Sequence, residues 1–148
     1  MLLRTSILLL ALAGPAGTAS AGSNATTCAL TDQQFATAIY TLREWPKIHA
    51  FYKAHFPPCP DDGMFAEGYS ELIVRTLATN WSNLSELRLA ASQDPRFKSF
   101  VLRHIDATTN EADLRAILSS ATSQCPKGNV ALCAEIRKAS SKALSELK

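Results

Sequence analysis

The sequence predicts an all-α fold, a bundle of six to seven short helices with two disulfides. Apolar residues recur at intervals of three and four along most of the chain after residue 30, which is the spacing of one helical face. No stretch alternates apolar and polar residues over the length of a strand. Brief turns separate the apolar segments, as is typical of helical bundles. We therefore expect residues 31–148 to form a single all-helical domain.

Residues 1–21 have the three parts of a secretory signal peptide. Arg4 supplies the positive start, residues 7–13 form a short apolar core, and residues 19–21 form a small-residue cleavage site. The apolar run is too short to span a bilayer as a permanent helix. An ordinary buried N-terminal helix explains these three parts less well. We expect cleavage after residue 21, followed by a flexible leader over residues 22–30.

The charge of the chain points away from nucleic acid and from membrane surfaces. The full sequence carries a formal charge of +2, so removal of Arg4 with the signal peptide leaves +1. There is no basic run and no interleaving of aromatic residues with Lys or Arg. We therefore expect no nucleic-acid partner, and no membrane association after the signal peptide is cleaved.

The four cysteines all follow the predicted cleavage site. An even number of cysteines in an exported chain predicts two disulfides, and four cysteines allow three pairings. We favour Cys28 with Cys59 and Cys125 with Cys133. The first pair ties the leader to the loop after the second helix, and the second closes a short turn between two helices. Zinc is the alternative, but no Cys-x-x-Cys pair or histidine cluster favours it, so we expect no metal.

The first two helices are bounded by clear start and stop signals. Thr31 is a candidate N-cap, and Gln34 three residues later completes a capping box for a helix over residues 31–44. Pro46 restarts the chain as a second short helix, and three prolines within residues 57–60 end it because they supply no backbone N–H. The residues expected to face the core are Phe35, Ala38, Ile39, Leu42, Ile48, Phe51 and Tyr52.

The middle of the chain predicts one long helix, a turn and a further helix. The long helix follows residues 61–63 and carries apolar residues on one face. Residues 80–82 are expected to form a turn, and Asn83 to cap the next helix with Glu86 reaching back to it. The inward-facing residues of the two helices are Phe65, Tyr69, Leu72, Ile73, Thr76, Leu77, Leu84, Leu87 and Ala91.

Three more helices are expected in the rest of the chain. Asp94 is an N-cap and Pro95 fills the first helical position, where a missing N–H costs nothing. Asn110 caps the next helix, residues 125–128 end it, and Asn129 opens the last one. The residues expected to face inward are Phe97, Phe100, Val101, His104, Ile105, Leu114, Ile117, Leu118, Ala121, Leu132, Ile136, Ala139, Ala143 and Leu147.

The lack of a recognisable catalytic motif indicates a binding protein rather than an enzyme. His104 lies on the apolar face of its helix and is interpreted as a hydrogen-bonded core residue. His49 and His55 are six residues apart and fall on different faces of a helix, so they do not form a zinc pair. No Gly-rich phosphate loop, Gly-x-Ser-x-Gly or His-Glu-x-x-His motif is present. We expect no catalytic residue and no cofactor.

Trp81 is placed by these patterns in a turn between two helices. Two interpretations remain open for it. An aromatic side chain on a loop can anchor a partner protein. It can equally pack back onto the bundle, because tryptophan has a large apolar area to bury.

Residues 69–136 carry a series of scaffold motifs in a recognisable order. They are a Tyr-led helix, an Asn-Trp pair, an Asp-Pro-x-Phe-x-x-Phe-Val helix start, a His-Ile-Asp step, and Cys-Pro-x-Gly before Leu-Cys. In this order the chain resembles the immunity proteins that neutralise amidase effectors of type VI secretion. The resemblance covers about residues 59–138.

The resemblance implies a periplasmic, all-helical, non-enzymatic inhibitor that forms a homodimer. The family's partner is a papain-like cysteine amidase that cuts peptidoglycan stem peptides, and a loop of the immunity protein would occlude its substrate groove to prevent self-intoxication. Such a loop must be rigid. Our first candidates for partner binding are Asn80, Trp81, Ser82 and Asn83. The second candidates, whose negative charge could meet a basic rim and speed association, are Asp61, Asp62 and Glu67.

The alternative function is an exported helical carrier of small apolar ligands. A cavity between helices can hold such a ligand. Against this reading, the chain lacks the two cysteines four residues apart that insect odorant carriers usually have. The residues that could line the cavity are Tyr40, Phe51, Phe65, Tyr69 and Phe100.

Overall fold

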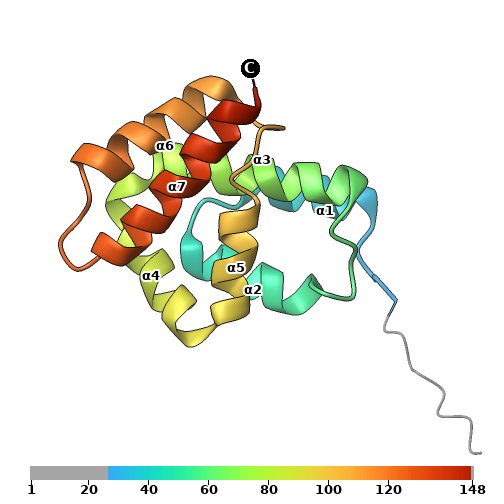
Figure 1. Cartoon of the computed structure of the whole chain (residues 1–148). Coiled ribbons are helices and arrows are strands. Elements are labelled where there is room, and N and C mark those ends of the chain that lie inside the picture. The colour runs from blue at the N-terminus through green and yellow to red at the C-terminus, as the bar shows by residue number, and fades with distance from the viewer. Residues whose placement is uncertain (1–26, 148) are drawn as a thin grey trace, which may run out of the picture.

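Seven α-helices and one short 3-10 helix follow one another along residues 27–147, the part of the chain that this computed structural model describes (Figure 1). There is no strand among these residues, so the all-α prediction is confirmed. The predicted signal peptide at residues 1–21, and the leader up to residue 26, lie outside the described residues. The helices are α1 (Asp32–Thr41), α2 (Trp45–His55), α3 (Gly63–Thr79), η1 (Trp81–Asn83), α4 (Leu84–Gln93), α5 (Pro95–Arg103), α6 (Glu111–Ser123) and α7 (Val130–Glu146).

Three of the predicted helix starts have the expected hydrogen bonds. Thr31 accepts from the Gln34 backbone N–H at 3.2 Å, and the Gln34 side chain accepts from the Thr31 N–H at 2.9 Å. Asp94 accepts from two backbone N–H groups of α5, and Asn110 accepts from two of α6. Helix α1 ends at Thr41 rather than at residue 44, because the chain must turn before α2 begins at Trp45.

The capping box expected between Asn83 and Glu86 does not form. Asn83 occupies the N-cap position of α4, but its side chain makes no cap hydrogen bond. Asn129 opens α7 as expected, also without a side-chain cap hydrogen bond. Residues 81–83 form a 3-10 turn that runs directly into α4, and the Leu84 N–H is bonded to the Trp81 carbonyl. This helical entry removes the need for the Asn83–Glu86 capping box, and the Asn83 amide donates to Asn80 Oδ1 instead, at 3.0 Å.

The helices are tied into the bundle by packing and by both predicted disulfides. Helix α3 packs against α1 and α6, α4 packs against α2 and α5, and α6 and α7 form an antiparallel pair (Figure 1). Cys28 is bonded to Cys59, and Cys125 is bonded to Cys133 across the turn between α6 and α7. The pairing expected from the sequence is therefore confirmed.

An aromatic cluster fills the centre of the front half. The Phe100 ring lies 4.8 Å from the Tyr52 ring and 5.0 Å from the Tyr69 ring, centroid to centroid. At Gly68, an added Cβ would lie 2.5 Å from Phe35 Cε1, so α1 and α3 approach as closely as a glycine allows. Within the described residues, no helix is long and apolar enough to cross a membrane.

Candidate partner-binding surface

The turn between α3 and α4, residues 80–83, is held from three directions. The Asn80 amide donates to the Arg43 carbonyl in the α1–α2 linker at 3.1 Å. The Trp81 indole N–H donates to the Gln124 carbonyl at the end of α6 at 2.9 Å. Within the turn, Asn83 donates to Asn80 and its backbone N–H reaches the Asn80 carbonyl. The turn is thus a rigid feature, because three of its four side chains are already held by hydrogen bonds within the protein.

Trp81 is half-buried and packs against the core cluster. This placement agrees with the packing interpretation, and the indole N–H is used inside the molecule rather than left for a partner. Ser82 is the exposed residue of the turn. A partner would therefore meet the Ser82 hydroxyl and the exposed part of the Trp81 ring, and the role of the turn in binding stays a prediction.

The second set of candidate partner-binding residues, Asp61, Asp62 and Glu67, differs in exposure. Asp62 and Glu67 are exposed, at the start of α3. Asp61 is turned towards the molecule, where its carboxylate pairs with Arg103 and lies 3.0 Å from Nε2 of His104, both at the end of α5. Of this set, only the exposed carboxylates are free to attract a basic partner, and that role too stays a prediction.

His104 and its neighbours form a buried polar network. The Ser70 hydroxyl donates to Asp106 Oδ2 at 2.6 Å, and Ser70 Oγ lies 2.9 Å from His104 Nδ1. A serine has one proton, so once that proton goes to Asp106 its oxygen must accept from Nδ1–H. His104 Nε2 lies 3.0 Å from Asp61 Oδ1, but the two atoms are not aligned as a hydrogen bond. The histidine predicted to be a hydrogen-bonded core residue is found in that role.

The electrostatics of this network follow from its burial. Burial lowers the pKa of His104, and this effect exceeds the opposing attraction of the Asp61 carboxylate. Burial alone would raise the pKa of Asp106, but hydrogen bonds from Ser70 and Thr108 outweigh it and leave that pKa lowered. Burial also raises the pKa of Tyr69 to about 12. The buried imidazole of His104 is therefore harder to protonate than an exposed one, whereas the carboxylate of Asp106 is easier to ionise.

Ser70, His104 and Asp61 match the residue types of a hydrolytic triad, but their arrangement does not fit that chemistry. Ser70 is 1% exposed, so a substrate does not reach its oxygen. Its proton is given to Asp106 rather than to the histidine that would act as base. All four cysteines are bonded in disulfides, and no group of His, Cys, Asp and Glu among the described residues could hold a metal ion.

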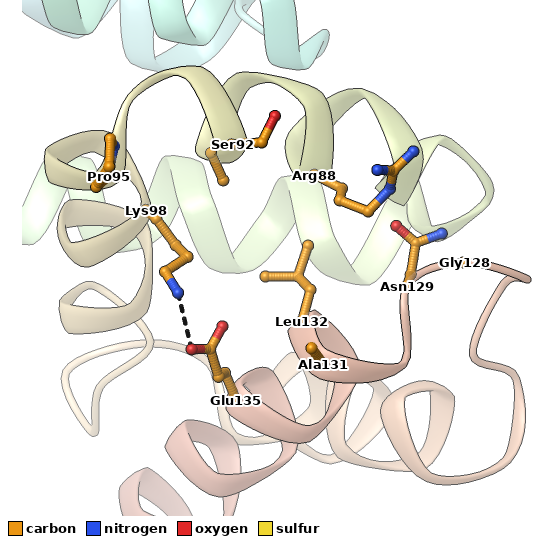
Figure 2. A pocket seen from close by; sticks show the side chains of 10 residues that line it. Arg88, Ser92, Pro95, Lys98, Gly128, Asn129, Ala131, Leu132 and Glu135 are labelled. Carbon is orange, nitrogen blue, oxygen red and sulfur yellow. Dashed lines mark hydrogen bonds and ion pairs between the residues drawn. The ribbon is translucent and has the colours of Figure 1, made fainter.

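A groove that the sequence did not predict lies between α4, α5 and α7 (Figure 2). Its volume is about 280 Å³. The Lys98 ammonium and the Glu135 carboxylate meet across one side of it at 2.8 Å. Its floor comes from helices that are far apart in sequence, so no local motif could have indicated it. The lining residues are Arg88, Ala91, Ser92, Pro95, Lys98, Gly128, Asn129, Ala131, Leu132 and Glu135.

The residues expected to line a carrier cavity do not share one. Tyr40 is 74% exposed on α1. Tyr69 and Phe100 pack ring against ring in the aromatic cluster. Phe65 lies against Phe35, with ring centroids 4.5 Å apart. The rings of Phe65, Tyr69 and Phe100 therefore fill space in the bundle instead of surrounding a cavity.

Comparison with known proteins supplies no relative for the chain. No family model matches it, and neither a curated protein nor a solved structure is similar enough to show kinship.

Proposed function

We propose that this chain is a periplasmic immunity protein, which binds a type VI secretion amidase effector and occludes its substrate groove. The proposal starts from the motif order over residues 69–136, which resembles that of such proteins. The observation that carries the mechanism is the fixed turn at residues 80–83, held by Arg43 and Gln124 from separate parts of the bundle.

The compartment supports this role at a coarser level. Two disulfides indicate an oxidising, extracytoplasmic location. The periplasm is the finer assignment, and it is where a peptidoglycan amidase would act on the cell's own wall. A protein that protects against such an enzyme must meet it there, after export through the predicted signal peptide.

The turn suits occlusion of a groove because it would lose little conformational entropy on binding. Fixing a mobile side chain at an interface costs about 0.5–1.5 kcal/mol. Asn80, Trp81 and Asn83 are already held by hydrogen bonds, so this cost falls mainly on exposed residues such as Ser82. The exposed carboxylates of Asp62 and Glu67 would raise the association rate with a basic rim.

The deciding experiment is a titration of the amidase effector encoded beside this gene with the disulfide-bonded protein. We expect stoichiometric loss of peptidoglycan cleavage and a stable complex on gel filtration. Light scattering on the free protein tests the homodimer that the family resemblance implies. Absence of a complex and of inhibition with that effector would overturn the immunity function.

A pair of variants tests whether the turn at residues 80–83 is the part that enters the amidase groove. Ser82→Arg adds bulk and charge at the exposed tip of the turn, and Ser141→Arg makes the same change on an exposed position of α7. We expect Ser82→Arg to weaken inhibition by about 100-fold, as for loss of a central interface contact, and Ser141→Arg to leave it unchanged. Equal inhibition by the two variants would show that another surface enters the amidase.

A further inference from the structure

The groove between α4, α5 and α7, here the Arg88–Asn129 groove, combines an apolar floor with polar groups at one end (Figure 2). We propose that it binds an acylated apolar amino acid with a free carboxylate, the chemistry shared by small N-acyl amino acids and by the C-terminal residue of a peptide. This ligand is separate from the amidase partner, so it can be tested without any effector.

The floor sets the size and polarity of the ligand. Ala91 and Leu132 are buried beneath the groove, and Pro95 and Ala131 form exposed apolar parts of its walls. The volume of about 280 Å³ lies just below the range of about 300–1,000 Å³ that is typical of small-molecule sites. The groove therefore suits one apolar side chain and its flanking amide rather than a long lipid chain.

The charges of the groove differ between its two ends. Lys98 is neutralised by Glu135 at 2.8 Å. Arg88 is exposed and forms no ion pair with any residue of the described part of the chain. A guanidinium binds a carboxylate through two parallel hydrogen bonds, so the carboxylate of the ligand is assigned to Arg88.

Asn129 supplies a second polar group at the same end. Its side chain is 1% exposed, and its amide nitrogen donates to the carbonyls of Pro126 and Lys127 at 3.3 and 3.2 Å. Carbonyls only accept, which fixes the orientation of the amide and leaves Asn129 Oδ1 as a buried acceptor without a hydrogen bond. The amide nitrogen also contacts Ser85 Oγ at 3.1 Å, and Ser85 lies one helical turn before Arg88 on α4.

These two groups match the pattern of one acylated residue. In such a residue the amide N–H and the carboxylate sit on the same Cα, so they can meet Asn129 Oδ1 and Arg88 together. Solvent does not reach Oδ1 in the free protein, so binding requires side chains at this end of the groove to move enough to admit the ligand N–H. The carboxylate then binds Arg88, and the apolar side chain lies on Leu132 and Ala91.

The test is an NMR titration of the disulfide-bonded protein with three related probes. N-acetyl-leucine carries every group, N-acetyl-leucinamide lacks the carboxylate, and 4-methylpentanoate lacks the N–H. We expect N-acetyl-leucine to bind with a dissociation constant in roughly the millimolar range, as its few atoms allow. Each of the other two should bind at least about tenfold more weakly, since each loses a hydrogen bond to a charged or buried group.

Matched variants locate the binding. Arg88→Gln should weaken binding of N-acetyl-leucine by about tenfold or more, whereas Arg137→Gln, an exposed arginine elsewhere on α7, should not. Ala131→Phe adds a ring to the wall from an exposed helical position and should block binding while the protein stays folded. A longer peptide, acetyl-Ala-Ala-Leu, separates the sources: tighter binding indicates a peptide C terminus, and equal binding a small acyl amino acid.

Two results would overturn the proposal. One is the absence of saturable binding of N-acetyl-leucine at millimolar concentration. The other is equal weakening by Arg88→Gln and Arg137→Gln, which would mean that a diffuse positive surface attracts the carboxylate. Neither result bears on inhibition of the amidase, so the two proposals fail independently.

Discussion

Removing the Cys28–Cys59 disulfide should destabilise the protein more than removing the Cys125–Cys133 disulfide. The perturbation is a pair of double variants, Cys28→Ser with Cys59→Ser and Cys125→Ser with Cys133→Ser. A disulfide restricts the unfolded chain, and in the chain-entropy model the effect grows with the length of the loop that it closes. The sequence separations are 31 residues for the first bond and 8 for the second.

These separations give the expected magnitudes. The loop-closure relation yields about 3.7 kcal/mol at 25 °C for the longer loop and about 2.5 kcal/mol for the shorter one. Each bond has one cysteine in the core, since Cys59 is 1% and Cys133 is 3% exposed. The cost of burying a serine hydroxyl is therefore similar in the two variants. It largely cancels in the comparison, and a difference of about 1.2 kcal/mol remains.

Urea unfolding monitored by far-UV circular dichroism measures both costs in water. The wild-type protein under oxidising conditions is the reference. Comparing the urea dependence of the unfolding free energy between wild type and each variant shows whether their unfolded states remain comparable. A larger loss from the Cys125–Cys133 variant would refute the reasoning. It would mean that the local geometry of the α6–α7 turn matters more than the length of the closed loop.

Three further outcomes follow from packing, titration and hydrogen bonding. Gly68→Ala should lower the free energy of unfolding by about 1–3 kcal/mol, because the new Cβ would lie 2.5 Å from the buried Phe35 ring. The variant should therefore show a lower Tm. An unchanged Tm would show that α1 moves away freely. Burial lowers the pKa of His104 in the folded protein. The unfolded chain therefore binds a proton at this histidine at a higher pH than the folded chain does. Stability should accordingly fall as the pH drops below about 6.5. His104→Gln should flatten that fall in urea titrations between pH 7 and 5.5, and an equally steep fall in the variant would contradict this. Trp81→Phe keeps an aromatic ring at this position but loses the hydrogen bond to the Gln124 carbonyl. Calorimetry should show a loss of about 0.5 kcal/mol, at the low end for a hydrogen bond. A loss above 2 kcal/mol would contradict this expectation.

The elements of the fold were predictable because their signals are local. The capping box at Thr31, the Asp94–Pro95 start and the Asn110 cap each involve residues within three positions, and all three appear in the structure. Asn83 shows the limit of this reasoning. Its type and position predicted a cap, but the 3-10 entry into α4 satisfied the backbone differently, and its side chain turned to Asn80.

The candidate sites were harder to predict because they depend on contacts that are distant in sequence. Asp61 was expected on an acidic loop, but Arg103 and His104, more than forty residues later, engage its carboxylate. The Arg88–Asn129 groove likewise joins residues of α4, α5 and α7. Composition and helical periodicity contain no information on which faces meet. The rigidity of the turn at residues 80–83 was required by the proposed mechanism, yet its partners became known only from the structure.

Because of the hydrogen bond from Trp81 to Gln124, the redox conditions in which the protein is produced bear on the proposed inhibition. Gln124 is followed immediately by Cys125, so the acceptor that steadies the proposed inhibitory turn is adjacent to the disulfide that closes the α6–α7 connection. Material made in a reducing cytosol would lack that covalent restraint. Weak inhibition by such a sample would not count against the proposed function, so each binding measurement needs a count of free thiols beside it.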